Sequence, residues 1–369
     1  MNDVDCMVVG AGVIGLAVGR ELALRGRQVI ILEQEQRIGL HTSSRNSEVV
    51  HSGIYYPPGS LKARLCVAGR ELLHRYCAER GIALRMCGKF IVATSPDQLS
   101  ELQALEFRAR ANGVADLEWR DGTQAVREEP ALACAAALWS PSTGIIDSQA
   151  YLLSLLADAE AHGAIIAYRS GVSSLRSTRA GVEVCINDEA ATVARAKVVV
   201  NCTGLDAHRV AASIDGFPAA HIPRIHFAKG NYFSLAGAAP FSRLIYPIPA
   251  AGGLGIHMSM DFNGCARFGP DVEWIEARDY TVDPNRAGGF TDAIRRYWPK
   301  ISSLALTPAY SGIRPTLSGP GNPPADFSLS GPSEHGVAGV VNLFGIDSPG
   351  LTASLALATQ VADMAAAAL

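Results

Sequence analysis

The sequence has 369 residues, of which 48% are hydrophobic and 18% charged, and its formal net charge is −3. This composition excludes a disordered chain, and the length is typical of about two domains, since single cores rarely exceed ~250–300 residues. The charge gives no basic surface for nucleic acid, and the scattered cysteines include no C-x-x-C pair that would favour structural zinc or a disulfide framework. No metal site is predicted, because no close His, Asp and Glu spacing lies on one helix face.

Neither a secretory signal nor a transmembrane segment is predicted. Asp3 and Asp5 stand where a signal needs a basic region. Asp347, Pro349 and Asp363 interrupt the apolar carboxyl-terminal stretch, so its uncharged run is shorter than the ~20 residues that span a bilayer. We expect a reducing, cytoplasmic location, with peripheral contact at the inner face of a membrane as an alternative.

The first predicted elements are a strand, a tight turn and a helix. A short apolar run over residues 5–9 ends in glycines, and apolar side chains then recur at helical spacing from Val13 to Leu22. Gly26 ends this helix, and residues 28–32 form a second apolar run. The pattern predicts a βαβ unit with two parallel strands.

Helices and strands continue to alternate along the rest of the chain. From residue 226 to 268 short apolar runs are broken by Gly and Pro, which predicts an antiparallel sheet. The further predicted helices are 61–76, 96–112, 148–162, 285–298 and one that starts near Pro349. The further predicted strands are 89–93, 172–175, 182–186, 197–201, 232–233, 244–246, 255–258 and 340–344.

A glycine-rich loop, residues 10–15, stands between the first strand and the first helix, where a phosphate-binding loop is expected. Gly10 permits a tight turn, Gly12 allows a pyrophosphate to approach the backbone, and Gly15 lets the helix pack closely. The pyrophosphate would contact the amino-terminal N–H groups of the helix. Glu33, at the end of the second strand, is placed to bind a ribose 2′-hydroxyl. The loop predicts dinucleotide binding, with NAD and FAD both possible.

Two later segments favour FAD. Residues 199–204 end a strand in a turn of small residues, and residues 345–352 open the final helix. The amino terminus of that helix could face the flavin N1–C2=O edge, where negative charge develops on reduction. A plain helix cap formed by Asp347 or Ser348, with Pro349 at the first helical position, explains the same residues, and both interpretations can hold together.

Taken together, these motifs resemble those of FAD-dependent oxidoreductases of the D-amino acid oxidase type. Within that group the chain is most similar to the L-2-hydroxyglutarate dehydrogenases/oxidases, over nearly its whole length. The resemblance is carried by the glycine loop with Glu33, the stretch Asn46–Cys66, the turn Asn201-Cys202-Thr203-Gly204, Leu254-Gly255-Ile256-His257, Phe268-Gly269-Pro270 and Ser348-Pro349-Gly350.

The resemblance implies an α/β (α+β) fold, in which a Rossmann-like FAD-binding domain holds an inserted antiparallel-sheet substrate domain. The expected FAD-binding domain is discontinuous and comprises 1–85, 145–215 and 316–369, with the substrate-binding domain at 86–144 and 216–315. FAD is expected to be bound non-covalently. The implied cofactor-binding residues are Gly10, Gly12, Val13, Ile14, Gly15, Glu33, Gln34, Thr42, Ser43, Ser44, Arg45, Asn46, Val172, Cys202, Thr203, Gly204, Gly312, Arg314, Asp347, Ser348, Pro349, Gly350, Leu351 and Thr352.

The resemblance also implies oxidation of an L-2-hydroxy acid, first of all L-2-hydroxyglutarate, to the 2-oxo acid by hydride transfer to flavin N5. Arg314 is the expected clamp for the substrate carboxylate, because a guanidinium fork matches a carboxylate bidentately. An alcohol must lose its proton as the carbonyl forms, and His51 and His257 are the candidate acceptors. Further candidate substrate residues are Tyr55, Lys229 and Tyr246, the last two for a distal carboxylate.

Two alternatives remain open at this point. An amino acid oxidase of the glycine, sarcosine or D-amino acid type would take a neutral amine and need no strong base. A more remote alternative is a non-catalytic nucleotide-binding module. For either enzyme the expected partner is a small-molecule carboxylate substrate. The electron acceptor can be oxygen, a quinone or an electron-transfer protein.

Overall fold

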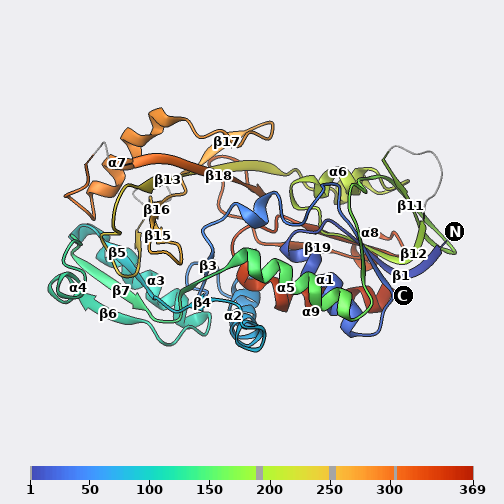
Figure 1. The fold of residues 1–369 in the computed structure, drawn as a ribbon, viewed down its shortest axis with the longest axis horizontal. Coiled ribbons are helices and arrows are strands. Elements are labelled where there is room, and N and C mark those ends of the chain that lie inside the picture. Colours follow the sequence, from blue (N-terminus) through green and yellow to red (C-terminus); the bar gives the residue numbers. More distant parts are fainter. Residues whose placement is uncertain (1, 188–193, 249–254, 303–305, 369) are drawn as a thin grey trace.

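The computed structural model describes residues 2–187, 194–248, 255–302 and 306–368. In this part of the chain the strands form an eight-stranded sheet, a nine-stranded sheet and a small three-stranded sheet. The two large sheets lie towards opposite ends of the long axis of the molecule (Figure 1).

The eight-stranded sheet has a parallel centre. β1 pairs in parallel with both β2 and β12, and β12 pairs in parallel with β20, whereas β10, β11 and β19 are joined by antiparallel pairing. Its strands are β1 (Asn2–Val9), β2 (Val29–Leu32), β9 (Ile165–Ala167), β10 (Val172–Thr178), β11 (Gly181–Ile186), β12 (Ala194–Asn201), β19 (Ser328–Ser330) and β20 (Val340–Phe344).

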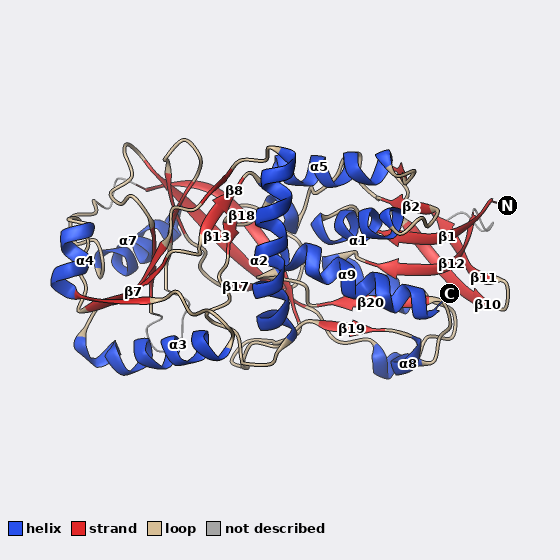
Figure 2. Ribbon diagram, turned by 90° about the horizontal axis from the view of Figure 1, so that it is seen from below, coloured by secondary structure: helices blue, strands red, loops and turns tan. Residues whose placement is uncertain are grey.

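The central strands of this sheet are buried on both faces, which explains their continuous apolar runs. On β1, Cys6 and Val8 face one hydrophobic cluster, whereas Met7 and Val9 face another. Figure 2 shows α1 (Val13–Leu24), α5 (Ser148–Ala161) and α9 (Gly350–Ala368) lying together over one face. The predicted strand–turn–helix beginning is therefore confirmed.

Strands of this sheet come from three parts of the sequence. β1 and β2 lie near the start, β9 to β12 in the middle, and β19 and β20 near the end. The nine strands of the second sheet come from the two stretches between these parts. The exact boundaries of the predicted domains stay a prediction.

The nine-stranded sheet departs from the expected antiparallel pattern at one pair. β14 runs parallel to β5, and because these strands come from distant parts of the chain, no hairpin fixes their relative direction. The strands are β5 (Lys89–Ala93), β6 (Glu118–Asp121), β7 (Ala136–Ser140), β13 (His226–Leu235), β14 (Leu244–Pro247), β15 (Met258–Met260), β16 (Ala266–Phe268), β17 (Glu273–Ile275) and β18 (Leu306–Thr316). The small sheet contains β3 (Val49–Val50), β4 (Leu84–Arg85) and β8 (Gly144–Ile146).

Two expectations for this sheet were wrong in detail. β13 and β18 form one long antiparallel pair instead of short runs, with Gly230 opposite Gly312. Of the predicted strand 255–258, only Met258 belongs to a strand, and Leu254 of the associated motif lies outside the described residues.

The long helix α2 (Leu61–Arg80) shows how local sequence sets helix ends. Ser60 Oγ accepts a hydrogen bond from Ala63 N at 3.1 Å, and Gly81 ends the helix in the left-handed region with φ of 64°. The remaining helices are α3 (Leu99–Ala111), α4 (Gly122–Glu128), α6 (Ala207–Ala212), α7 (Ala287–Arg295) and α8 (Pro332–His335). The predicted helix 285–298 is thus shorter than expected, because Pro299 disfavours a helical conformation just before it.

By length and composition alone, α9 could cross a membrane, since its mean hydropathy reaches 1.3 over an 18-residue window. Half of that window is buried inside the protein, against α1 and α2. The apolar character of α9 is therefore accounted for by its place in the core.

Candidate active site

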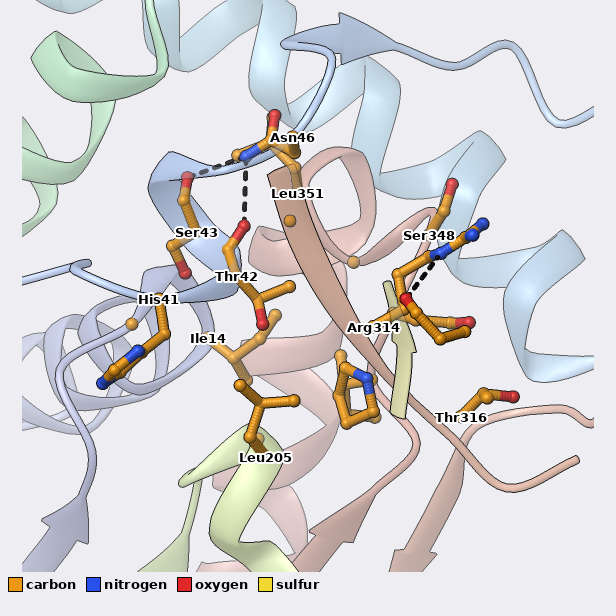
Figure 3. A pocket seen from close by; sticks show the side chains of 18 of the residues that line it. Ile14, His41, Thr42, Ser43, Asn46, Leu205, Arg314, Thr316, Ser348 and Leu351 are labelled. Carbon is orange, nitrogen blue, oxygen red and sulfur yellow. Dashed lines mark hydrogen bonds between the residues drawn. The ribbon is translucent and has the colours of Figure 1, made fainter. Parts of the chain in front are cut away.

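A cavity of about 970 Å³ lies between the two large sheets, at the upper end of the ~300–1,000 Å³ that is typical of ligand sites. One side is formed where β1, β2, β12 and β20 end, and the other by residues of β13, β14 and β18. Figure 3 shows side chains from these distant segments, among them Ile14, Thr42, Leu205 and Arg314, converging on the cavity.

The glycine loop forms one end of the cavity. Gly10 has φ of 97°, and a Cβ there would lie 2.9 Å from the carbonyl oxygen of Cys202, the residue that follows β12. Gly12 directly precedes α1 and has no side chain to cap the helix, so the backbone at the start of α1 borders the cavity. A Cβ on Gly15 would lie 1.8 Å from Gly10 O, so Gly15 packs the helix on the loop and does not line the cavity.

Glu33 is held rigidly beside this loop. Its Oε2 accepts a hydrogen bond from Ala11 N at 2.7 Å, and its Oε1 accepts one from Glu35 N at 2.9 Å. The side chain is 8% exposed and lines the cavity together with Gln34 and Val172. A fixed carboxylate at the end of β2 can accept from a ribose hydroxyl.

The loop of residues 42–46 connects the glycine loop to the second sheet. Ser43 Oγ accepts from Val13 N at 2.9 Å, and Asn46 Nδ2 donates to Ser43 O at 2.7 Å (Figure 3). A Cβ on Gly312 would lie only 1.9 Å from Arg45 O, so glycine is required for this close approach. Ser44 is exposed and does not line the cavity, which contradicts its expected contact with the cofactor.

The segment that precedes α9 lies beside α2. Lys62 Nζ is 2.8 Å from Asp347 Oδ1, and burial raises the pKa of the Asp347 carboxyl while Lys62 opposes that rise. Asp347 and the four residues after it line the cavity. Thr352 does not: it is fully buried, and its Oγ1 accepts from His51 N at 3.0 Å. Its hydroxyl is thus engaged by the backbone of His51.

Two histidines face the substrate end of the cavity. His51 Nε2 lies 3.3 Å from Ser348 Oγ, and the His257 ring stacks on the Tyr246 ring with centroids 3.6 Å apart. Burial, together with the nearby charge of Lys89, lowers the pKa of both histidines to about 3. Both imidazoles are therefore neutral near pH 7 and able to accept a proton.

Arg314 lines the same end. Its Nε and Nη2 donate to the main-chain oxygens of Ala228 and Asp271 at 3.5 and 3.3 Å, so the side chain is held by neutral acceptors. Within the described part of the chain Arg314 has no salt bridge. An arginine whose charge is not matched by a carboxylate is suited to bind one from a ligand.

Lys229 does not reach the cavity, contrary to expectation. It is 2% exposed, and its Nζ lies 2.7 Å from Asp279 Oδ2 and 3.8 Å from Glu273 Oε2. Its charge is therefore neutralised within β13 and its neighbours. Sequence alone hides this pairing, because Asp279 is remote in the chain.

Two lysines were missed by sequence reasoning. Lys62 lines the cavity through its pairing with Asp347, and Lys89 lies behind the cavity wall with 1% of its surface exposed. The one available signal for Lys89 was a charged residue opening an apolar strand, 89–93.

The structure brings nearly all predicted residues together. Gly15, Ser44, Lys229 and Thr352 are the predicted site residues that do not line the cavity. Those that do are Gly10, Gly12, Val13, Ile14, Glu33, Gln34, Thr42, Ser43, Arg45, Asn46, His51, Tyr55, Val172, Cys202, Thr203, Gly204, Tyr246, His257, Gly312, Arg314, Asp347, Ser348, Pro349, Gly350 and Leu351.

Comparison with known proteins decides the family. A family model described as "FAD dependent oxidoreductase" matches residues 5–364. The chain belongs to this family. This FAD-dependent oxidoreductase has the predicted fold class, because it superposes with a TM-score of 0.89 on the FAD-bound L-α-glycerophosphate oxidase of Mycoplasma pneumoniae, at 22% identity over 99% of this chain and 95% of that one.

Two similar proteins are both named L-2-hydroxyglutarate dehydrogenase. This oxidoreductase is 44% identical to the mitochondrial L-2-hydroxyglutarate dehydrogenase of Arabidopsis thaliana, over 98% of this chain and 83% of that protein. It is 28% identical to the L-2-hydroxyglutarate dehydrogenase of Escherichia coli (strain K12), over 84% of this chain and 82% of that protein.

The cavity of this oxidoreductase fits FAD. The amino termini of α1 and α9 open into one cavity, and an anionic pyrophosphate or a reduced flavin is stabilised at such termini. A side chain at Gly12 would stand between α1 and Ser43, at 3.0 Å from Ser43 Oγ, where the backbone must stay accessible. Glu33 supplies a ribose acceptor at the far end.

Proposed function

We propose that this oxidoreductase converts an L-2-hydroxy acid, first of all L-2-hydroxyglutarate, to the 2-oxo acid with non-covalently bound FAD. The observation that carries the proposal is the meeting of Arg314, which forms no salt bridge with a described residue, with the neutral imidazoles of His51 and His257 in one cavity. The 44% identity to a plant L-2-hydroxyglutarate dehydrogenase supports the choice of substrate.

The residues divide into a cofactor end and a substrate end. FAD, when bound, accepts the substrate hydride at its N5 atom. The backbone of the glycine loop and the start of α1 would hold the pyrophosphate, and Glu33 the adenosine ribose. The segment 347–351 would contact the flavin.

At the substrate end, Arg314 binds the 1-carboxylate and so fixes the position of the α-carbon. As the α-hydrogen leaves as hydride, the hydroxyl proton passes to Nδ1 or Nε2 of a neutral imidazole, and the carbonyl forms. His51 and His257 are both available for this transfer, because neither carries a charge at neutral pH.

Anaerobic reduction of the flavin tests this proposal. Purified protein saturated with FAD is mixed without oxygen with L-2-hydroxyglutarate, D-2-hydroxyglutarate, glycine, sarcosine or D-alanine, and the flavin absorbance near 450 nm is followed. We expect loss of absorbance with the L-hydroxy acid alone. Bleaching by an amine but not by the hydroxy acid would instead establish an amino acid oxidase.

Two further measurements complete the assignment. Acid or heat denaturation followed by filtration should release all of the flavin, since a covalent flavin would stay with the protein. Oxygen uptake compared with reduction of a quinone analogue or a dye identifies the electron acceptor.

A further inference from the structure

Lys89 is a buried amine that pairs with no carboxylate among the described residues. It is the first residue of β5, between β14 and β7, and 1% of its surface is exposed. Within the described residues it forms neither a salt bridge nor a side-chain hydrogen bond. A buried charge is costly unless it is paired, and burial lowers the pKa of Lys89 to about 7.

The contacts of this ammonium are two tyrosine rings of the cavity wall. Nζ lies 4.7 Å from the ring centroid of Tyr55 and 4.7 Å from that of Tyr246. Both tyrosines line the cavity, and Tyr246 also stacks on His257. The charge of Lys89 reaches the cavity interior, because it lowers the pKa of both His51 and His257.

The same two tyrosines have free hydroxyl groups. Neither phenol is hydrogen-bonded to another described residue. Burial raises the pKa of both, so each keeps its proton and remains a hydrogen-bond donor at every working pH. Two O–H donors, with an amine behind them whose protonated form a bound carboxylate stabilises, form a receptor for one carboxylate.

This receptor is separate from the carboxylate clamp at Arg314, and Lys229 cannot serve it because Asp279 neutralises its charge. We propose that Lys89, Tyr55 and Tyr246 bind a second, distal carboxylate, so that the cavity selects a dicarboxylic 2-hydroxy acid. The inference rests on the proposed function and deepens it. Lys89 acts here as a specificity-determining residue, while the two phenols make the direct contacts.

Paired substrates test the assignment. L-2-hydroxypentanoate has a methyl group where L-2-hydroxyglutarate has its distal carboxylate, and the two are otherwise the same length. In Lys89→Met we expect kcat/KM for the dicarboxylate to fall about 10–100-fold, while that for the monocarboxylate changes less than about threefold. Tyr55→Phe and Tyr246→Phe keep the rings and should show the same selective loss, and Lys89→Arg, which keeps the charge, should restore part of the selectivity.

An equal loss for both substrates would overturn the proposal, because a structural role or an effect through the histidines does not distinguish them. A binding measurement separates this result from failure of the proposed function. Glutarate and pentanoate are titrated into the FAD-loaded protein, and the perturbation of the flavin spectrum is recorded. Tighter binding of glutarate that is lost in Lys89→Met supports the receptor even if L-2-hydroxyglutarate is not oxidised, and equal affinities in wild type overturn it.

Discussion

The ammonium of Lys62 and the carboxylate of Asp347 lie 2.8 Å apart and join the start of α2 to the turn that opens α9. Their side chains are only 9% and 14% exposed, and the ammonium also lies 5.3 Å from the centroid of the Phe327 ring. The pair therefore fixes the part of the cavity wall that is expected to contact the flavin.

Removing one partner of this pair should destabilise the protein strongly. Lys62→Met leaves Asp347 buried without its counter-charge, and we expect a loss of about 3 kcal/mol in the free energy of unfolding. The double variant Lys62→Met/Asp347→Asn removes both charges and should recover part of the loss. Urea unfolding of wild type, both single variants and the double variant measures the coupling, and strictly additive effects would show that the contact is not energetically important.

Replacing Arg314 should weaken substrate binding without loss of FAD. For Arg314→Met we expect KM to rise about 100-fold, and Arg314→Lys should be intermediate because the charge remains while the fork is lost. Arg295→Met is a matched control, since Arg295 pairs with Asp292 on the surface of α7. Unchanged KM in Arg314→Met, with normal flavin content, would place the carboxylate clamp elsewhere.

The two histidines can be separated by the rate of flavin reduction. The variant that lacks the true proton acceptor, His51→Gln or His257→Gln, should lose about 10²–10⁴-fold in this rate, and the other much less. In wild type the acid limb of the rate profile should lie well below pH 6.5, because the pKa of both rings is lowered to about 3. Stopped-flow measurements at several pH values test both points, and near-normal rates in both variants would exclude an imidazole base.

The close approach of Gly312 to Arg45 makes this glycine sensitive to substitution. In Gly312→Ala a Cβ would lie 1.9 Å from a main-chain oxygen, so the 42–46 loop must move, and we expect destabilisation by about 1–3 kcal/mol together with weaker FAD binding. Gly288 offers the control, because it is exposed in α7 with nothing within 4 Å of an added Cβ. Gly288→Ala should be neutral or slightly stabilising. Thermal unfolding measures the stability of the two variants, and titration measures their affinity for FAD. Equal values for both variants would contradict the prediction.

Lys89 should make stability depend on alkaline pH. Its pKa is lowered from 10.5 to about 7 on folding, so between these values the unfolded chain binds a proton that the folded protein lacks. Stability therefore rises with pH across this window, by up to about 1.4 kcal/mol per pH unit, and this gain is absent below pH 7. The groups near its ammonium are Tyr55, Tyr246, His51, His257 and Cys66, and none of them gains or loses a proton in the folded protein between pH 7 and 10.

The prediction compares wild type with Lys89→Met at pH 7.5 and 9.5, with FAD in the same excess. The difference in unfolding free energy between the two proteins should grow in favour of wild type at the higher pH. A constant difference would mean that Lys89 stays protonated in the folded protein.

Local sequence patterns were sufficient to predict the residues of the cofactor half of the site. The glycine loop, Glu33 and the turn before α9 follow strands whose apolar runs are unambiguous, and parallel strands place their ends at one edge of a sheet. Ser44 and Thr352 could not be excluded in this way, because which residues of a turn face a ligand depends on packing against other segments. Thr352, for example, turns towards the backbone of His51.

The substrate half of the site could not be predicted from local patterns, because it depends on contacts between distant segments. Lys229 and Lys89 both open buried stretches of strand, and nothing in their own neighbourhoods shows that Asp279 neutralises one while two tyrosine rings enclose the other. The parallel pairing of β5 with β14, which brings Lys89 beside Leu244 and near Tyr246, also lies beyond local pattern. Charge pairing in a core is a property of the assembled sheet.

β20 and α9 come later in the chain than the strands and helices they pack against, which has a consequence for biosynthesis. β20 pairs with β12 inside the first sheet, and residues 347–351 complete the cavity wall. A nascent chain on the ribosome therefore exposes the open edge of β12 and an incomplete cofactor site until residues 340–351 have left the exit tunnel.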